Sequence, residues 1–266
     1  MDRIVGDFPD YVKCIDDSLI WDESIEDNFH RVCEFLDRCN RGGCIFNPDK
    51  FQLGAREVDF LGFRVTDTGV RPSPSFIENI LSFPSPKTLT NVHSWFGAIN
   101  QISYTFAKTT AMLPFRHLLS AKVNFMWLEE LEKAFQASKQ EIVRQCEKGV
   151  RCFTPYKPMA LATDWSRQGM GFWLCQKFCE CEGLPPRPGC CKDGWQTIFC
   201  SSRFCTAAES RYHPIEGDAL AATYELEKCR FFVLGHPNLI LCLDHKPLLS
   251  LFGDQDLASI TNPRLF

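Results

Sequence analysis

Residues 159–176 read MALATDWSRQGMGFWLCQ, and this stretch decides the fold class. Two apolar runs of strand length, 159–164 and 171–176, flank a glycine-containing turn at 169–171. Short apolar runs bounded by glycine are typical of buried strands. The stretch therefore predicts an antiparallel pair of strands inside a folded core.

The flanking sequence predicts a mixed α/β fold. On the C-terminal side we expect a strand at 195–201, a helix at 215–232, a strand at 239–243 and a helix from 246 to 251. This order of strands and helices is typical of a mixed sheet with flanking helices. On the N-terminal side, four prolines between 71 and 86 mark a change of module. The elements expected before and after them are hairpins at 10–21 and 58–65 (closed at 67–69), strands at 44–46 and 50–53, and helices at 24–39, 75–82, 90–102, 110–119 and 128–146.

Three aspartates fall where this order of elements brings side chains together. Asp164 ends a strand, Asp218 lies in the first turn of a helix, and Asp244 ends the last strand. Acids at strand ends converge at one edge of an open α/β sheet, where ligands bind. Taken singly, each is also typical of a turn or a helix cap. His213 follows a tyrosine in a loop, and His245 lies in a helix-entry motif. Proton transfer is the alternative for both, and we expect both to be structural residues.

A second pair of acids, Asp16-Asp17, lies in the hairpin predicted at 10–21. Adjacent carboxylates repel each other, so such a turn is either fully solvated or neutralised by a cation. Hard oxygen ligands of this kind suit Mg²⁺. The dipeptide alone leaves both interpretations open.

The formal net charge of −4 is distributed unevenly. Residues 1–60 carry 14 acidic and seven basic side chains, whereas residues 80–128 carry no acidic side chain. This contrast fits a metal site beside a phosphate-binding surface, and equally fits chance clustering on solvated faces. Trp95, Phe96, Tyr104 and Phe106 lie in the acid-free block, where they either stack on nucleic acid or form a helical core. Their helical spacing favours the core.

Several motifs, in order along the chain, resemble the Pol polyprotein of gypsy-type LTR retrotransposons. CIDD at 14–17, NPDK at 47–50 and FLGF at 60–63 resemble the YxDD motif, the N-P-x-K element and the primer-grip hairpin of a reverse transcriptase palm. FPSPKTLTNVHSWFGAINQI at 83–102 and FMWLEELEKAFQASK at 125–139 resemble the thumb and connecting helices. ATDWS, ESRYHPIEGDALA and LDHKPLL, which begin at residues 162, 209 and 243, resemble the RNase H domain.

The resemblance implies three regions and two metal-dependent activities. Residues 1–70 are expected to be the end of the palm, 71–150 the thumb and connection, and 151–266 a C-terminally truncated RNase H-like domain. The family hydrolyses RNA in RNA–DNA hybrids and makes DNA on RNA by two-metal catalysis with Mg²⁺ or Mn²⁺. The implied partners are an RNA–DNA hybrid or primer–template and the remainder of the polyprotein. The implied catalytic and metal-binding residues are Asp16, Asp17, Asp164, Asp218 and Asp244, and the implied nucleic-acid contacts are Phe60, Leu61, Gly62 and Lys87.

Departures from the family pattern concern both sites. Cys14 stands where the family has Tyr, and no strand carrying the first palm aspartate precedes Asp16. Asp218 stands where the RNase H helix has Glu, and the fourth acid of that family falls beyond Phe266. Glu216 substitutes for Asp218 only if it lies before the helix. We therefore expect no polymerase activity and weak or no nuclease activity. The alternative is a catalytically inactive nucleic-acid-binding or structural remnant.

Cysteine is unusually frequent, at fifteen residues, and seven of these lie between 175 and 205. Cys179, Cys181, Cys190 and Cys191 fit a tetrahedral Zn²⁺ site, although C-x-C and C-C are not the usual knuckle spacings. Redundant loop thiols and an oxidised clasp are the alternatives, and a zinc-binding interaction module is a third functional hypothesis. The N-terminus does not have the pattern of a signal peptide, and no apolar run approaches 18 residues. We expect a reducing intracellular location, cytoplasmic or nuclear, without membrane contact.

Overall fold

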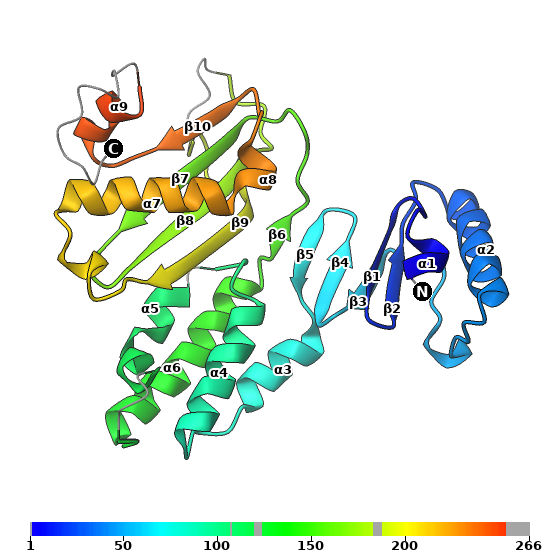
Figure 1. The fold of residues 1–266 in the computed structure, drawn as a ribbon, viewed down its shortest axis with the longest axis horizontal. Coiled ribbons are helices and arrows are strands. Elements are labelled where there is room, and N and C mark those ends of the chain that lie inside the picture. The colour runs from blue at the N-terminus through cyan, green and yellow to red at the C-terminus, as the bar shows by residue number, and fades with distance from the viewer. Residues whose placement is uncertain (1, 107, 120–123, 183–187, 254–266) are drawn as a thin grey trace. The chain divides into compact units, whose positions relative to one another are not determined.

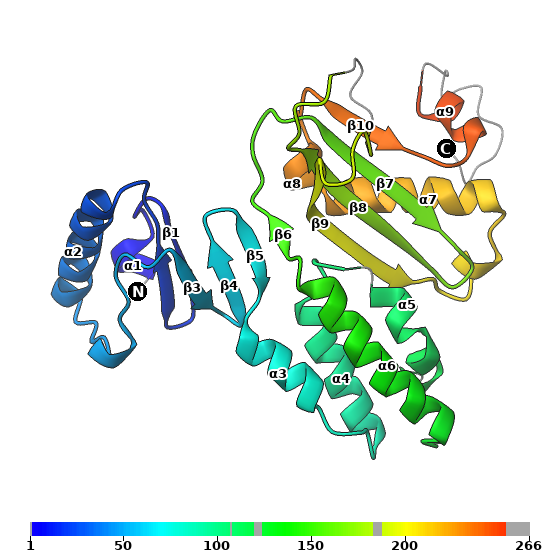
Figure 2. The same ribbon diagram turned by 180° about the vertical axis from the view of Figure 1, so that it is seen from behind.

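The computed structural model describes residues 2–106, 108–119, 124–182 and 188–253. The chain divides into two compact units, residues 1–67 and residues 68–266, which we call the N-terminal and C-terminal units. Figures 1 and 2 show the elements of both. No helix within these described ranges is long and apolar enough to cross a membrane.

The N-terminal unit pairs a hairpin with one long helix. Its elements are α1 (Asp2–Val5), β1 (Tyr11–Cys14), β2 (Asp17–Ile20), α2 (Ile25–Arg41), a short 3-10 helix (Pro48–Lys50), β3 (Glu57–Phe60) and β4 (Phe63–Thr66). The core consists of Val5, Phe8, Phe35 and Cys39. Helix α2 begins as predicted, because the Ser24 hydroxyl accepts a hydrogen bond from the backbone N–H of Asp27 (3.1 Å).

Two details of this unit differ from the prediction. Residues 44–46 and 51–53 are irregular instead of extended strands, and the Asn47 side chain caps the 3-10 helix by accepting from the N–H of Asp49. The second hairpin closes at Leu61-Gly62 instead of 67–69.

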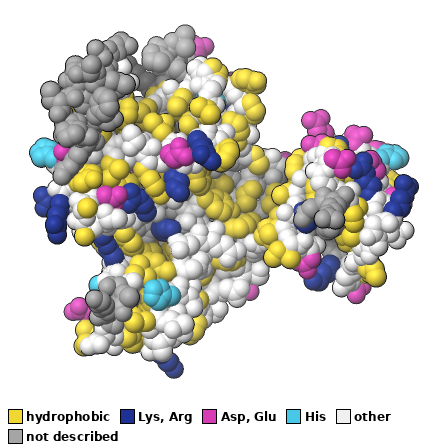
Figure 3. Space-filling model, viewed as in Figure 1, with side chains coloured by type: hydrophobic (Ala, Val, Ile, Leu, Met, Phe, Trp, Pro, Cys, Tyr) yellow, Lys and Arg dark blue, Asp and Glu magenta, His cyan; other side chains and the backbone are white. Residues whose placement is uncertain are grey.

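The first half of the C-terminal unit is helical. Its elements are β5 (Gly69–Pro72), α3 (Pro74–Ser82), α4 (Leu89–Gln101), α5 (Lys108–Met112), a 3-10 helix (Leu113–Leu119), α6 (Glu129–Cys146) and β6 (Val150–Arg151). Trp95 is fully buried, with its ring 5.1 Å from that of Phe83 and 4.9 Å from that of Phe135. Phe106 is also buried. These two aromatic side chains of the acid-free block are therefore core residues. On the face in Figure 3, the helices α3–α6 show isolated basic and histidine side chains instead of a continuous basic patch.

The second half is a four-stranded mixed sheet, as the sequence predicted. Its elements are β7 (Met159–Trp165), β8 (Gly169–Lys177), β9 (Trp195–Phe204), a 3-10 helix (Glu209–Arg211), α7 (Pro214–Lys228), α8 (Arg230–Val233), β10 (Leu239–Cys242) and α9 (Lys246–Leu251). The strand order is β10-β7-β8-β9; β10 is parallel to β7, and the other pairs are antiparallel. Helix α7 covers one face of the sheet, in front of it in Figure 1 and behind it in Figure 2.

Helix α7 packs unusually closely on β7 at its first turn. A Cβ atom on Gly217 would lie 2.2 Å from the Trp165 ring, which is far inside van der Waals contact. Only glycine therefore allows this approach. Because Trp165 follows Asp164 and Gly217 precedes Asp218, the contact brings the two aspartates to the same end of the sheet.

The buried face of α7 also carries a carboxyl group that the sequence analysis missed. Asp218, Ala221, Ala222 and Glu225 follow the i, i+3, i+4, i+7 spacing of one helix face, and all four are buried. Glu225 is 0% exposed, and neither carboxyl oxygen has a hydrogen-bond partner among the described residues. Burial, followed by the charge of Asp164, raises the pKa of Glu225 to about 9. Glu225 is therefore protonated at neutral pH.

We expect Gly217→Ala to lower the free energy of unfolding by about 1–3 kcal/mol, because the new methyl group overlaps the rigid Trp165 ring. Gly97→Ala is the matched control. Gly97 lies in α4 with open space around it, so the substitution should stabilise the chain by roughly 0.5–1 kcal/mol. Urea denaturation followed by circular dichroism measures both changes. Stabilisation by both substitutions would contradict the packing described here.

We expect Glu225→Gln to alter how stability depends on pH. Above pH 4.5 the unfolded carboxyl ionises, whereas the folded one keeps its proton up to about pH 9. Wild-type stability should therefore fall with rising pH, relative to the variant, by up to about 1.4 kcal/mol per pH unit in this window. Denaturation curves between pH 5 and 8.5 measure the difference. Glu227→Gln, an exposed neighbour on α7, should leave the profile unchanged; parallel wild-type and Glu225→Gln profiles would refute the assignment.

Candidate functional site

Three predicted acids lie toward one edge of the C-terminal sheet: Asp218 and Asp244 fall in one group of close ligand atoms, and Asp164 lies outside that group but near enough for its charge to interact with theirs. Asp164 is the penultimate residue of β7, Asp218 lies in the first turns of α7, and Asp244 lies two residues after β10. The parallel pairing of β10 with β7 places the ends of both strands at the same edge. Glycine at 217 allows α7 to bring Asp218 to that edge.

Asp218 is the buried member of the group. Its side chain is 10% exposed, against 71% for that of Asp244. Its Oδ2 atom lies 2.6 Å from Nδ1 of His245, and the same nitrogen lies 3.9 Å from Oδ1 of Asp244. Single ligand atoms of Asp218, Asp244 and His245 all lie within 4.8 Å of one another. The group thus combines a buried carboxylate with an accessible one.

The charges of the acids act on one another. Burial raises the pKa of Asp218, and Asp244 raises it further, while His245 lowers it. Asp164 is a solvent-exposed residue. Partial burial of its carboxyl group nevertheless raises its pKa, and the negative charge of Asp244 raises it further. Negative charges held this close favour a bound cation. The aspartates offer the hard oxygen ligands that Mg²⁺ and Mn²⁺ prefer.

Two side chains near the aspartates, those of His245 and Glu216, have different contacts. His245 precedes α9 as expected, and its imidazole also contacts Asp218. Glu216 lies inside α7, where its carboxylate accepts the backbone N–H of His213 at 3.2 Å. Glu216 therefore caps the helix and does not substitute for Asp218.

The predicted acids of the N-terminal unit lie at the tip of the β1–β2 hairpin. The turn consists of Ile15 and Asp16, and Asp17 begins β2 opposite Cys14. Ile15 has a φ of 55°, a left-handed conformation that is strained for a β-branched residue, and it is 85% exposed. The groups of three or more metal ligands found among the described residues do not include Asp16 or Asp17. The metal site at this hairpin stays a prediction.

The residues predicted to contact nucleic acid lie at a hairpin turn and in a loop, and Leu61 and Lys87 are the exposed ones among them. Phe60 ends β3, and Leu61 and Gly62 form a two-residue turn with φ of 54° and 83°. Two successive positive φ values are typical of the hairpin turn that matches strand twist. Lys87 is exposed between α3 and α4, and its backbone N–H donates to the Asn91 side chain. The four cysteines predicted as zinc ligands lie close together, after the end of β8 and before the start of β9.

A family model described as the RNase H-like domain found in reverse transcriptase matches residues 154–266. This range contains Asp164, Asp218 and Asp244. The matched domain therefore coincides with the part of the C-terminal unit that holds the acid cluster.

Curated relatives include the Transposon Tf2-3 and Tf2-7 polyproteins of Schizosaccharomyces pombe. The Tf2-3 polyprotein is 27% identical over 169 residues, which is 63% of this chain and 12% of the polyprotein. The Tf2-7 polyprotein is 26% identical over 180 residues, which is 66% of this chain and 13% of the polyprotein. The chain thus spans about an eighth of the length of these relatives.

Solved structures of the foamy viral protease–reverse transcriptase have a similar fold. The one in complex with RNA/DNA hybrid has a TM-score of 0.70 at 19% identity and covers 94% of this chain and 32% of the viral chain. The one in complex with dsDNA has a TM-score of 0.70 and covers 99% of this chain and 55% of the viral chain. The chain is therefore similar to retrotransposon polyproteins, and its residues 154–266 match the RNase H-like domain found in reverse transcriptase.

Proposed function

We propose that the C-terminal unit hydrolyses the RNA strand of an RNA–DNA hybrid. The observation that carries this proposal is the convergence of Asp164, Asp218 and Asp244 at one sheet edge, within the range matched by the RNase H-like family. The hybrid bound in one foamy viral structure supports this substrate class. We assign the chain further to the gypsy type, with the rest of its polyprotein as a partner.

The acid cluster fits a divalent cation. The aspartates supply oxygen ligands, and the pKa values of Asp164 and Asp218 are raised partly by Asp244, so a cation would relieve the repulsion. Mg²⁺ or Mn²⁺ bound here would activate water and stabilise the departing 3′ oxygen of the RNA. Asp164, Asp218 and Asp244 would hold the cation. His245 would orient the Asp218 carboxylate from behind through its 2.6 Å contact.

The N-terminal unit would contribute to nucleic-acid binding. We propose that Asp16 and Asp17 belong to a polymerase metal site, and that Phe60, Leu61 and Gly62 contact a primer strand. The exposed positions of both hairpin turns support these roles. In the C-terminal unit, Lys87 is an exposed cation between two helices and would contact phosphate.

We expect the chain to cleave the RNA of a labelled RNA–DNA hybrid weakly in Mg²⁺ or Mn²⁺, and Asp164→Asn to lower the rate at least 100-fold. The substitution removes one negative ligand and leaves the size of the side chain unchanged. Gel analysis of the products measures the rate. Glu227→Gln, which removes an exposed acid elsewhere on α7, is the matched control. Hybrid binding without cleavage would favour the inactive remnant and overturn the proposal.

We expect His245→Ala to raise the Mg²⁺ concentration needed for half-maximal cleavage about 10-fold, because outer-shell partners orient metal ligands. The substitution leaves the start of α9 intact, since the His245 side chain makes no capping hydrogen bond there. His245→Asn, which retains an N–H donor, should restore part of the affinity. His93→Ala, at an exposed position of α4, is the control. An unchanged metal requirement in His245→Ala would show that this imidazole does not position Asp218.

A further inference from the structure

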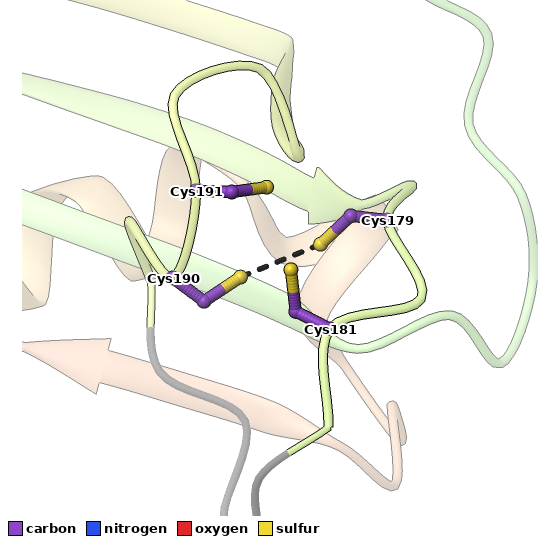
Figure 4. Close-up of side chains that lie close together, drawn as sticks. All are labelled: Cys179, Cys181, Cys190 and Cys191. Carbon is purple, nitrogen blue, oxygen red and sulfur yellow. Dashed lines mark hydrogen bonds between the residues drawn. The ribbon is translucent and has the colours of Figure 1, made fainter.

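Four cysteines lie close together in the segment between β8 and β9. Cys179 and Cys181 follow β8, and Cys190 and Cys191 precede β9. Figure 4 shows the four side chains directed toward a common centre. The four Sγ atoms all lie within 4.8 Å of one another. This cluster plays no part in the proposed nuclease chemistry.

The spacing of the sulfur atoms fits a metal better than a disulfide. Tetrahedral zinc bound by four thiolates at about 2.3 Å places its sulfur atoms about 3.8 Å apart. The Sγ atoms of Cys179 and Cys190 are 3.4 Å apart, whereas a disulfide bond measures about 2.05 Å. Cys179, Cys181, Cys190 and Cys191 are all free thiols in the structure.

The backbone around the cluster is already ordered by the hairpin. The N–H of Phe178 donates to the carbonyl of Gly194 at 2.7 Å, which continues the strand pairing to the edge of the cluster. A Cβ atom on Gly194 would lie 2.4 Å from the sulfur atoms of both Cys179 and Cys191. Glycine at this position therefore leaves the space that the two sulfur atoms occupy.

The four side chains also match a metal in their chemistry. Thiolates are soft ligands, which bind Zn²⁺ in preference to hard cations. Sulfur atoms that already lie within 4.8 Å of one another need little movement to bind one ion, which displaces their protons.

We propose that Cys179, Cys181, Cys190 and Cys191 bind one structural Zn²⁺ ion. All four positions of a tetrahedral ion are filled by sulfur, so the site is closed and has no position for substrate. The Lys177 ammonium donates to the carbonyl of Cys181 at 2.5 Å and places a positive charge at one of the four ligand residues. The ion ties residues that follow β8 to residues that precede β9.

The test is zinc content of the full chain purified under reducing conditions. We expect one zinc per chain by mass spectrometry of the metal, and less than 0.2 zinc per chain in the variant Cys181→Ser/Cys190→Ser. The control is Cys33→Ser/Cys152→Ser, which removes two exposed cysteines outside the cluster and should keep the zinc. Cobalt substitution should give the absorption of tetrahedral thiolate coordination in the wild type and the control only.

Two results would overturn the proposal. The first is zinc at the same level in both double variants, or at less than 0.2 per chain in the wild type. The second is a disulfide among these four cysteines in the reduced protein, detected by alkylation and mass spectrometry, which would show an oxidised clasp. Circular dichroism of both variants separates loss of the ion from loss of the fold, because a folded Cys181→Ser/Cys190→Ser chain that lacks zinc still supports the site.

Discussion

The close contact between Gly217 and the Trp165 ring is the constraint on which the candidate nuclease site depends. It sets the distance between α7 and β7, and it lies one residue from both Asp218 and Asp164. The parallel pairing of β10 with β7 then adds Asp244 at the same edge. A helix packed farther out would keep the same residues on the same elements and would separate their charges. The site is therefore a product of packing at one helix end.

The same packing buries carboxyl groups on one face of α7, and this burial costs free energy. Ala221 and Ala222 give the helix a small face toward the sheet, but Asp218 and Glu225 place two carboxyl groups on that face. Asp218 is compensated by His245, whose Nδ1 atom lies 2.6 Å from its carboxylate. Glu225 lies deeper and keeps its proton instead. Two acids seven residues apart on one helix thus have different surroundings: His245 lowers the pKa of Asp218 against the effect of burial, whereas burial raises the pKa of Glu225 to about 9.

Much of the C-terminal unit could be predicted from the sequence, because the strands β7–β10 alternate with turn residues and carry strong apolar runs. The strands predicted at 44–46 and 50–53 failed because short apolar runs near Asn47 and Pro48 also fit a capped 3-10 turn. The three aspartates could be placed from element order. Two features could not be predicted, the contact of His245 with Asp218 and the burial of Glu225, because both arise from the packing of α7 and α9. The i, i+7 spacing from Asp218 was the one available signal for Glu225.

The central claim is that Asp164, Asp218 and Asp244 form one cation site. Crystals of the chain soaked in Mn²⁺ and measured near the manganese absorption edge test it directly. The account predicts an anomalous difference peak between the three carboxyl groups, lost in crystals of Asp164→Asn/Asp218→Asn. Manganese bound elsewhere, or no peak at this sheet edge, would contradict it.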